Sequence, residues 1–309
     1  MSPPKLLAIP NVSEGRDRST IDAIAAAFTE TAPDAVRLLD VHSDTDHHRS
    51  VFTLAGEPTE LAQALLRGAR VAVGRIEVMG RAGRGPEETG QHPHVGALDV
   101  MPIVYLDRAA RGAACAEALL VGDRIGDELG VPVFLYGELS GATPLETRTR
   151  AQLRRGGVVG LARRMAAGHA SLTPDFGPSR LHPTAGATLL AVREPLVAFN
   201  LQLAPPATID DARRIAALIR EGGEHGLPGL RAIGVSLHDG QLAQVSMNVE
   251  RPFEVPLVAV VEAVRAHAAL HSAELVGLAP AAALEAFPED LAMPGFDPAR
   301  HVIENALGC

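Results

Sequence analysis

Two histidines separated by one residue, His92 and His94, precede an apolar stretch in QHPHVGALDVMP (residues 91–102). If this segment is extended, both side chains point to the same face of a strand. An imidazole with an unperturbed pKa of about 6.5 is the natural general acid and base at neutral pH. Since a histidine at a loop–strand boundary is more often structural, the pattern alone leaves both interpretations open.

A second group of candidate residues lies in DVHSDTDHHRS (residues 40–50). Imidazole and carboxylate groups are ligands for zinc and similar ions, so a metal site is one interpretation. The spacing matches no closed structural zinc site and no zincin motif, and a solvated acidic turn explains it as well. We therefore expect no metal. The side chains concerned are Asp40, His42, Asp44, Asp46, His47, His48 and Arg49.

The glycine-rich segment GRAGRGPEETG (residues 80–90) does not have the spacing of a phosphate-binding loop. We interpret it as a mobile loop, with a lid as an open alternative because it directly precedes His92. Neither a G-x-S-x-G motif nor a Ser/His/Asp order indicates a nucleophilic serine.

The composition excludes several classes of function. Of 309 residues, 47% are hydrophobic, and the formal net charge is -9. No cluster of Lys and Arg interleaved with aromatic residues occurs, which argues against a nucleic-acid partner. No apolar stretch approaches the ~20 residues of a membrane span, and the start lacks the apolar segment of a signal peptide. Only Cys115 and Cys309 are present, which favours the reducing cytoplasm.

The hydrophobic periodicity predicts the elements that must position these residues. In the first half, helical spacing covers residues 20–31, 58–73 and 113–129, and strands are predicted at 5–9, 35–41, 49–56, 98–106 and 131–136. In the second half, helices are predicted at 208–222 and 256–270, and strands at 195–203, on both sides of Asp239-Gly240 within 230–249, and at 273–278.

Both halves follow the order β-α-β-β-α-β, which is that of a split βαβ unit. We therefore predict an α+β fold of two ferredoxin-like sandwich subdomains from a duplication, spanning residues 1–192 and 193–309. We expect helices on one face of each sheet and a ligand cleft between the sheets. The Pro- and Gly-rich stretch at 172–188 would join the halves, and its glycines at 177 and 186 would let backbone approach a flat ligand.

An ordered series of sequence motifs resembles the formiminotransferase family, the glutamate formimidoyltransferases. The series runs from about residue 6 to about residue 305 and includes both halves of the chain. The motifs are IPNVSEGRD, SDTDHHRSVFTLAG, HPHVGALDVMPIVYL, VPVFLYGEL, PDFGPSRLHPTAGAT, LVAFNLQL, LRAIGV and LAQVSMNV.

The resemblance implies two ferredoxin-like subdomains, a folate tunnel between them and a homodimer. It also implies that the formimino group of N-formimidoyl-L-glutamate moves to N5 of tetrahydrofolate, a co-substrate, with release of L-glutamate. Animal members carry a fused cyclodeaminase domain, so here a separate enzyme would complete that step.

The resemblance also assigns roles to individual residues. His92 matches the family's catalytic histidine and would act as general acid and base. The substrate-binding candidates are Asn11, His42, His48, Arg49 and His94. The family's folate-contacting loop falls on Gly177, Pro178, Ser179, Arg180, Leu181, His182, Pro183, Thr184, Ala185 and Gly186.

Three positions depart from the animal enzymes, which carry Asp, Asn and Arg where this chain has His42, His48 and His94. Neutral imidazoles could hydrogen-bond the amidine, or several imidazoles could bind a divalent metal; we prefer the first alternative. We expect turnover to vary with pH between about 5 and 8 as imidazoles titrate. The other functions considered are a related formyl or amidine one-carbon transferase and a catalytically silent folate-binding homologue.

Overall fold

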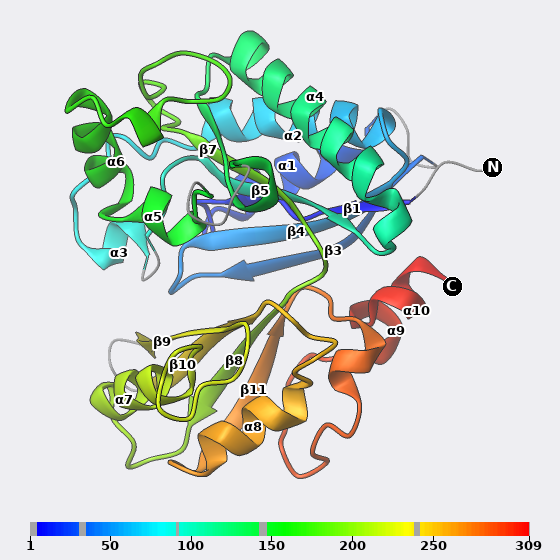
Figure 1. The fold of residues 1–309 in the computed structure, drawn as a ribbon, viewed down its shortest axis with the longest axis vertical. Coiled ribbons are helices and arrows are strands. Elements are labelled where there is room, and N and C mark those ends of the chain that lie inside the picture. The colour runs from blue at the N-terminus through cyan, green and yellow to red at the C-terminus, as the bar shows by residue number, and fades with distance from the viewer. Residues whose placement is uncertain (1–4, 31–34, 91–92, 142–146, 238–241, 309) are drawn as a thin grey trace. The chain divides into compact units, whose positions relative to one another are not determined.

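The computed structural model describes residues 5–30, 35–90, 93–141, 147–237 and 242–308. They fold as two compact units, Met1–Glu194 and Pro195–Cys309 (Figure 1). The first unit contains a seven-stranded sheet and the second a four-stranded sheet. The predicted α+β class with two subdomains is confirmed.

The sheet of the first unit has the strand order β1-β4-β2-β5-β7-β6, with β3 paired to β4. Its pairings are antiparallel, except that β7 runs parallel to both β5 and β6. Because β1 and β2 both lie between β4 and β5, they act as two halves of one interrupted strand. The strands are β1 Leu6–Ala8, β2 Asn11–Val12, β3 Val36–Asp44, β4 Arg49–Gly56, β5 Leu98–Tyr105, β6 Val133–Leu135 and β7 Thr188–Arg193.

Three helices and one face of the sheet enclose the main core of this unit: α1 (Arg18–Thr29), α2 (Glu60–Arg75) and α4 (Arg111–Leu129). The rings of Phe28 and Phe52 meet edge to face, 5.3 Å between centroids. Gly68 on α2 makes room for this pair, because a Cβ there would lie 2.1 Å from the Phe28 ring.

The opposite face of the same sheet is covered in part by α5 (Arg150–Arg154) and α6 (Gly157–Ala166). Leu153 and Leu161 from these helices join a second apolar cluster with Val100 and Leu189 of the sheet. The expectation of helices on one face only is therefore wrong for this unit. Neither these two helices nor β7 was predicted, because the short segments offer little periodicity.

The Pro- and Gly-rich stretch at 172–188 lies inside the first unit. Phe176 bridges to Val133 of β6, and Ala187 donates a backbone hydrogen bond to Val95. The chain then continues through β7, and the division between the units falls after Glu194. The interpretation of this stretch as the join is therefore wrong.

The second unit follows the element order β-α-β-β-α-β, with antiparallel strands in the order β11-β8-β10-β9. The turn predicted at Asp239-Gly240 lies outside the described residues, and the ferredoxin-like assignment of both halves stays a prediction. The elements are β8 Val197–Leu203, α7 Ile209–Ile219, β9 Leu230–Leu237, β10 Leu242–Val249, α8 Leu257–Arg265, β11 Leu270–Val276, α9 Pro298–His301 and α10 Ile303–Leu307.

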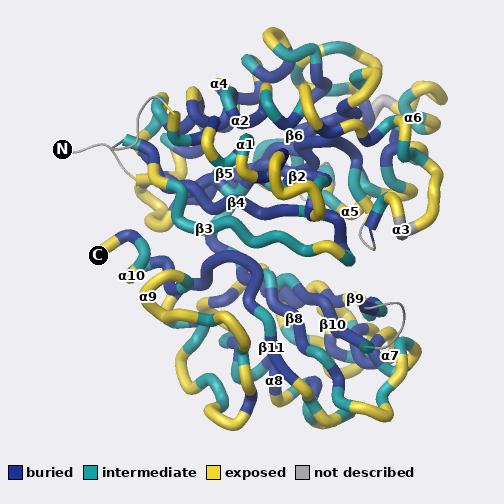
Figure 2. Tube along the Cα trace, turned by 180° about the vertical axis from the view of Figure 1, so that it is seen from behind, coloured by how far each residue is buried: buried dark blue, intermediate teal, exposed yellow. Residues whose placement is uncertain are grey.

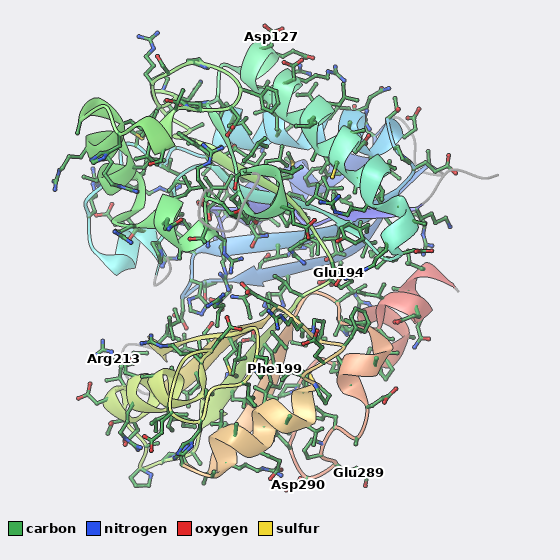
Figure 3. The ribbon with its side chains drawn as sticks, viewed as in Figure 1. Asp127, Glu194, Phe199, Arg213, Glu289 and Asp290 are labelled. Carbon is green, nitrogen blue, oxygen red and sulfur yellow. The ribbon has the colours of Figure 1, made fainter. Side chains whose placement is uncertain are left out.

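The two faces of this smaller sheet differ in polarity. Alternate residues such as Val245 and Phe199, which is labelled in Figure 3, pack in the core of this unit with residues of α7 and α8. Figure 2 shows that most of β8 and β10 is buried. The residues between them form polar rows across the strands. These rows consist of Gln202, Gln244 and Ser272, and of Asn200, Ser246 and Glu274.

In the described part of the chain, no helix combines the length and the apolar character needed to cross a membrane.

Candidate functional site

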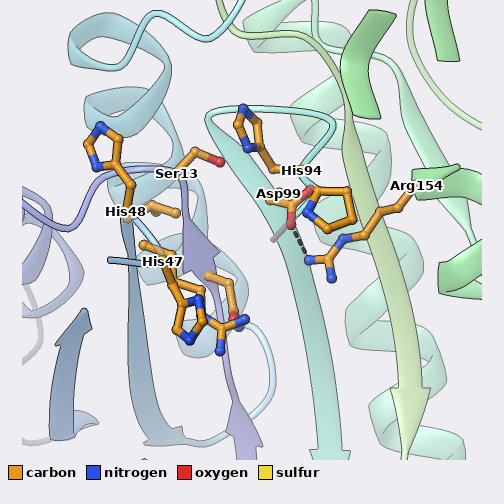
Figure 4. A pocket seen from close by; sticks show the side chains of 10 residues that line it. Ser13, His47, His48, His94, Asp99 and Arg154 are labelled. Carbon is orange, nitrogen blue, oxygen red and sulfur yellow. Dashed lines mark hydrogen bonds and ion pairs between the residues drawn. The ribbon is translucent and has the colours of Figure 1, made fainter. Parts of the chain in front are cut away.

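A pocket lies at one edge of the larger sheet, entirely within the first unit (Figure 4). Its cavity volume is about 10 Å³, room for about one water molecule, so its side chains close on one another. The lining residues are Asn11, Val12, Ser13, His47, His48, Arg49, Pro93, His94, Asp99 and Arg154.

Strand register brings three distant segments together at this pocket. Val12 of β2 pairs with Ser50 of β4 on one side and with Leu98 of β5 on the other. The residues beside these partners, Arg49 and Asp99, therefore reach the same edge of the sheet. Ser13, directly after β2, donates its hydroxyl to the Gly96 carbonyl at 2.7 Å and fixes the loop before β5.

His48 occupies a tight turn and is held as a neutral imidazole. Its backbone is left-handed, with φ of 48°, a region that Asn and His enter more readily than bulky residues. Burial, reinforced by the nearby Arg81 cation and opposed by Glu14, lowers the His48 pKa from 6.5 to about 4. The Gly15 N–H donates to Nδ1 at 3.1 Å, while Arg81 contacts Nε2.

Two glycines make this turn possible. A Cβ on Gly15 would lie 2.2 Å from the Asp44 carbonyl oxygen, and one on Gly90 would lie 2.2 Å from the His47 carbonyl oxygen. The segment at 80–90 thus packs against the turn through Gly90 as well as through Arg81. Whether it acts as a lid stays a prediction.

Arg49, at the start of β4, supplies a permanent positive charge to the pocket. Burial, together with the Arg154 and Arg150 cations, lowers its pKa to about 10, whereas Asp44 and Asp99 raise it. The guanidinium remains protonated at neutral pH. Within the described residues, no hydrogen-bond or ion-pair partner lies against it.

An ion pair that sequence reasoning missed crosses the pocket. One Asp99 oxygen accepts the Val95 N–H at 2.7 Å, and the other pairs with Arg154 at the end of α5 (Figure 4). The only signal in the sequence is a single acid within the apolar stretch GALDVMP. Arg154 gave no signal, because α5 itself was not predicted.

The segment from Gly177 to Gly186 ends in a tight turn that backs onto this pocket. His182 and Gly186 exchange backbone hydrogen bonds of 2.9 and 3.1 Å, and Gly186 bridges to Gly96. Pro183 and Thr184 at the turn are exposed.

Both glycines of this segment have a structural role within the first unit, and their predicted contact with a ligand stays a prediction. A Cβ on Gly186 would lie 2.3 Å from the Val95 carbonyl oxygen, and one on Gly177 would lie 2.9 Å from the Gly126 Cα. Both also have positive φ, 78° and 72° for Gly177 and Gly186. They let other backbone segments approach, so replacing either one disturbs the fold before it reports on a ligand.

Comparison with known proteins identifies the family. Residues 5–193 match the N-terminal subdomain of the formiminotransferase domain, and residues 198–288 match the formiminotransferase domain. The chain belongs to the formiminotransferase family.

Its relatives in this family occur with and without a second enzyme domain. It is 36% identical to the glutamate formimidoyltransferase of Streptococcus pyogenes serotype M1 over 97% of both chains. It is 32% identical to that of Thermoplasma acidophilum, covering 94% of this chain and 93% of the relative. It is 38% identical to the formimidoyltransferase-cyclodeaminase of Sus scrofa, covering 89% of this chain and 50% of that longer relative.

The structure brings together four of the substrate-binding residues predicted from the formiminotransferase resemblance. Asn11, His48, Arg49 and His94 line one pocket. His42 lies in β3 opposite Val51 and is not among the residues that line it.

The remaining predictions for this formiminotransferase stay open. His92 lies outside the described residues. Among those described, no group of three or more His, Cys, Asp and Glu side chains is placed to hold a metal ion. The roles assigned to the individual residues, and the cleft expected between the sheets, stay predictions.

Proposed function

We propose that this chain is a glutamate formimidoyltransferase that uses tetrahydrofolate as co-substrate. N5 of tetrahydrofolate attacks the amidine carbon of N-formimidoyl-L-glutamate and forms a carbon–nitrogen bond. The bond from that carbon to the glutamate nitrogen breaks, and the proton lost from N5 reaches the departing amine. The products are 5-formiminotetrahydrofolate and L-glutamate.

The observation that carries this proposal is the Arg49 guanidinium in the pocket. A cation that has no hydrogen-bond or ion-pair partner among the described residues is suited to bind a carboxylate through paired hydrogen bonds. The donor amino acid offers such carboxylates next to its reactive amidine. The names of the relatives, glutamate formimidoyltransferase, agree with this substrate.

We assign the proton transfer to His92. Pro93, the residue after it in the sequence, lines the pocket together with His94. His48 is not suited to this role, because a pKa of about 4 leaves it a weak base at neutral pH. It is better placed to shape the pocket wall through Gly15 and Arg81.

Tetrahydrofolate would contact the segment from Gly177 to Gly186. Gly186, at the end of this segment, bridges to Gly96, whose carbonyl accepts the Ser13 hydroxyl in the pocket wall. This arrangement supports a folate ring held close to the donor. The low cysteine content supports a cytoplasmic enzyme, and the family resemblance supports a homodimer.

The direct test incubates the protein with tetrahydrofolate and a panel of formimino and formyl donors. We expect 5-formiminotetrahydrofolate and L-glutamate to appear together and in equal amounts with N-formimidoyl-L-glutamate. Faster transfer from a formyl donor would instead support the related one-carbon transferase. No transfer from any donor would support a silent folate-binding homologue.

Substitution of His92 tests the assigned proton transfer. His92→Ala should lower kcat by about 10²–10⁴, the usual contribution of a general acid and base. The affinity for tetrahydrofolate, measured by calorimetry, should change much less. A variant with near wild-type turnover would remove this role from His92.

A further inference from the structure

The hydrogen-bonding capacity of Arg154 is only partly used. Its Nη2 pairs with Asp99, but its Nε is buried and has no hydrogen-bond partner among the described residues. A buried donor left unpaired costs free energy, about 1–3 kcal/mol. The Arg154 Nε–H group is therefore an unpaired hydrogen-bond donor beside Asp99.

The charges around the pocket do not balance. Arg49 and Arg154 both line it, whereas Asp99 is the one acid among the described lining residues. Asp99 contacts the Val95 N–H and Arg154, and it makes no ion pair with Arg49. The described lining thus holds two guanidinium groups and one carboxylate, and a second carboxylate would complete the set.

We propose that Arg154 is a second carboxylate-binding residue, acting beside Arg49 on the amino-acid donor, and that Asp99 is its positioning residue. The proposal rests on the proposed function, since it names which part of the donor this pocket holds. It also gives the pocket two arginines although residue 94 is histidine, where the animal enzymes carry arginine.

The surroundings of Arg154 are built to aim it. The Thr149 and Gln152 capping box begins α5, and the guanidinium of Arg164 holds the Gln152 and Leu153 carbonyls at 2.9 and 2.8 Å. The end of α5 that carries Arg154 is thus fixed. Because the cavity is only about 10 Å³, the side chains that line it must move apart when the donor carboxylate binds.

Steady-state kinetics of two variants tests the proposal. Arg154→Gln should raise KM for N-formimidoyl-L-glutamate about 10- to 100-fold, the range for a lost hydrogen bond to a charged group. KM for tetrahydrofolate should stay within about twofold. Arg154→Lys keeps the positive charge but lacks the planar guanidinium with its paired donors. Its KM for N-formimidoyl-L-glutamate should lie between those of wild type and Arg154→Gln.

A matched control and a positioning variant complete the series. Arg163→Gln on α6 removes an exposed arginine whose side chain makes no hydrogen bond or ion pair with the described residues, and it should leave both KM values unchanged. Asp99→Asn should also raise KM for the donor, because it frees Arg154 to move. Thermal unfolding of each variant shows that the fold is intact. An unchanged donor KM in Arg154→Gln, or an equal rise for both substrates, overturns the proposal.

Calorimetry with L-glutamate as the probe separates this proposal from the proposed function. If wild type transfers the formimino group but Arg154→Gln binds glutamate equally well, the carboxylate-binding role of Arg154 is wrong and the proposed function stands. If wild type transfers nothing but binds glutamate, and Arg154→Gln weakens that binding, the proposed function is wrong and the role of Arg154 stands. Absence of glutamate binding and of transfer by wild type overturns both.

Discussion

His48 illustrates how surroundings decide what a histidine can do. Its sequence context, DTDHHRS, suggests an ordinary solvated imidazole that titrates near neutrality. The fold instead buries it beside Arg81 and lowers its pKa to about 4. The expected variation of turnover between pH 5 and 8 therefore cannot come from this residue.

The lowered pKa predicts a pH-dependent stability. Between pH 4 and 6.5 the unfolded chain binds a proton at His48 that the folded chain does not bind. The stabilisation is therefore fully present above pH 6.5 and is lost as the pH falls toward 4. His48→Asn should reduce this loss by about 1–3 kcal/mol, because Asn accepts the left-handed backbone and does not titrate.

Urea unfolding of wild type and His48→Asn at pH 7.5, 6, 5 and 4.5 measures this difference. The two proteins should diverge only as the pH falls below 6.5. Parallel curves over the whole range would show that His48 titrates normally in the folded protein.

At the scale of elements, the start of α2 depends on a side chain of α4 that lies 55 and 58 residues further along the chain than the two groups it caps. Thr59 at the start of α2 has φ of 73° and makes no side-chain cap. Glu117 of α4 supplies the cap instead, accepting the Thr59 and Ala62 N–H groups at 2.8 and 2.6 Å. Burial raises the Glu117 pKa, and these two hydrogen bonds oppose that rise.

Glu117→Ala should therefore lower the free energy of unfolding by about 2–4 kcal/mol, since a buried and a half-buried N–H group lose their acceptor. Asp127→Ala on the same helix, an exposed position (Figure 3), should change it by no more than about 0.5 kcal/mol. Urea unfolding monitored by circular dichroism gives both values. Similar effects of the two substitutions would rule out the capping role.

The polar face of the smaller sheet offers a second element-scale prediction. Gln244 is fully buried, and neither of its side-chain polar atoms has a hydrogen-bond partner in the described chain. Gln244→Leu should raise the free energy of unfolding by about 1 kcal/mol, because leucine has a similar volume and no polar atoms that need a hydrogen-bond partner.

Gln202→Leu is the matched control for Gln244. It lies in the same row, but its Oε1 accepts the Ser272 hydroxyl at 2.7 Å. Its replacement by leucine should therefore not raise the free energy of unfolding. A loss of stability in Gln244→Leu would show that the amide does have a partner. Weaker tetrahydrofolate binding in a more stable variant would indicate that the amide is kept for a ligand.

At the scale of the whole molecule, the two units have separate cores. The clusters around Phe28 and Phe52 and around Phe199 and Val245 share no residue. The smaller sheet has all four of its strands paired within its own unit. These features are those of an independently folding domain.

The fragment Pro195–Cys309 should therefore fold alone. We expect a cooperative thermal transition by circular dichroism and dispersed amide signals by NMR. A fragment that begins within β8, for instance at residue 201, should do neither, because β8 lies between β10 and β11. A non-cooperative transition for the complete unit would show that its core is insufficient.

The sequence by itself determined the elements with a strong local period and the family. Helices α1, α2, α4, α7 and α8 and most strands were predicted to within a few residues, because burial of one face imposes a 3.6- or 2-residue repeat along the chain. The motif series likewise placed Asn11, His48, Arg49 and His94 at a common site, and they do line one pocket.

Only the tertiary structure decided how that pocket is completed. Asp99 and Arg154 are 55 residues apart and meet because α5 packs on the sheet where β5 begins. The low His48 pKa depends in the same way on Arg81, 33 residues along the chain. Such contacts leave no periodic trace in the sequence, since they depend on strand register and helix packing. The neutral state of His48 and the presence of both Arg49 and Arg154 in one pocket therefore depend on the fold.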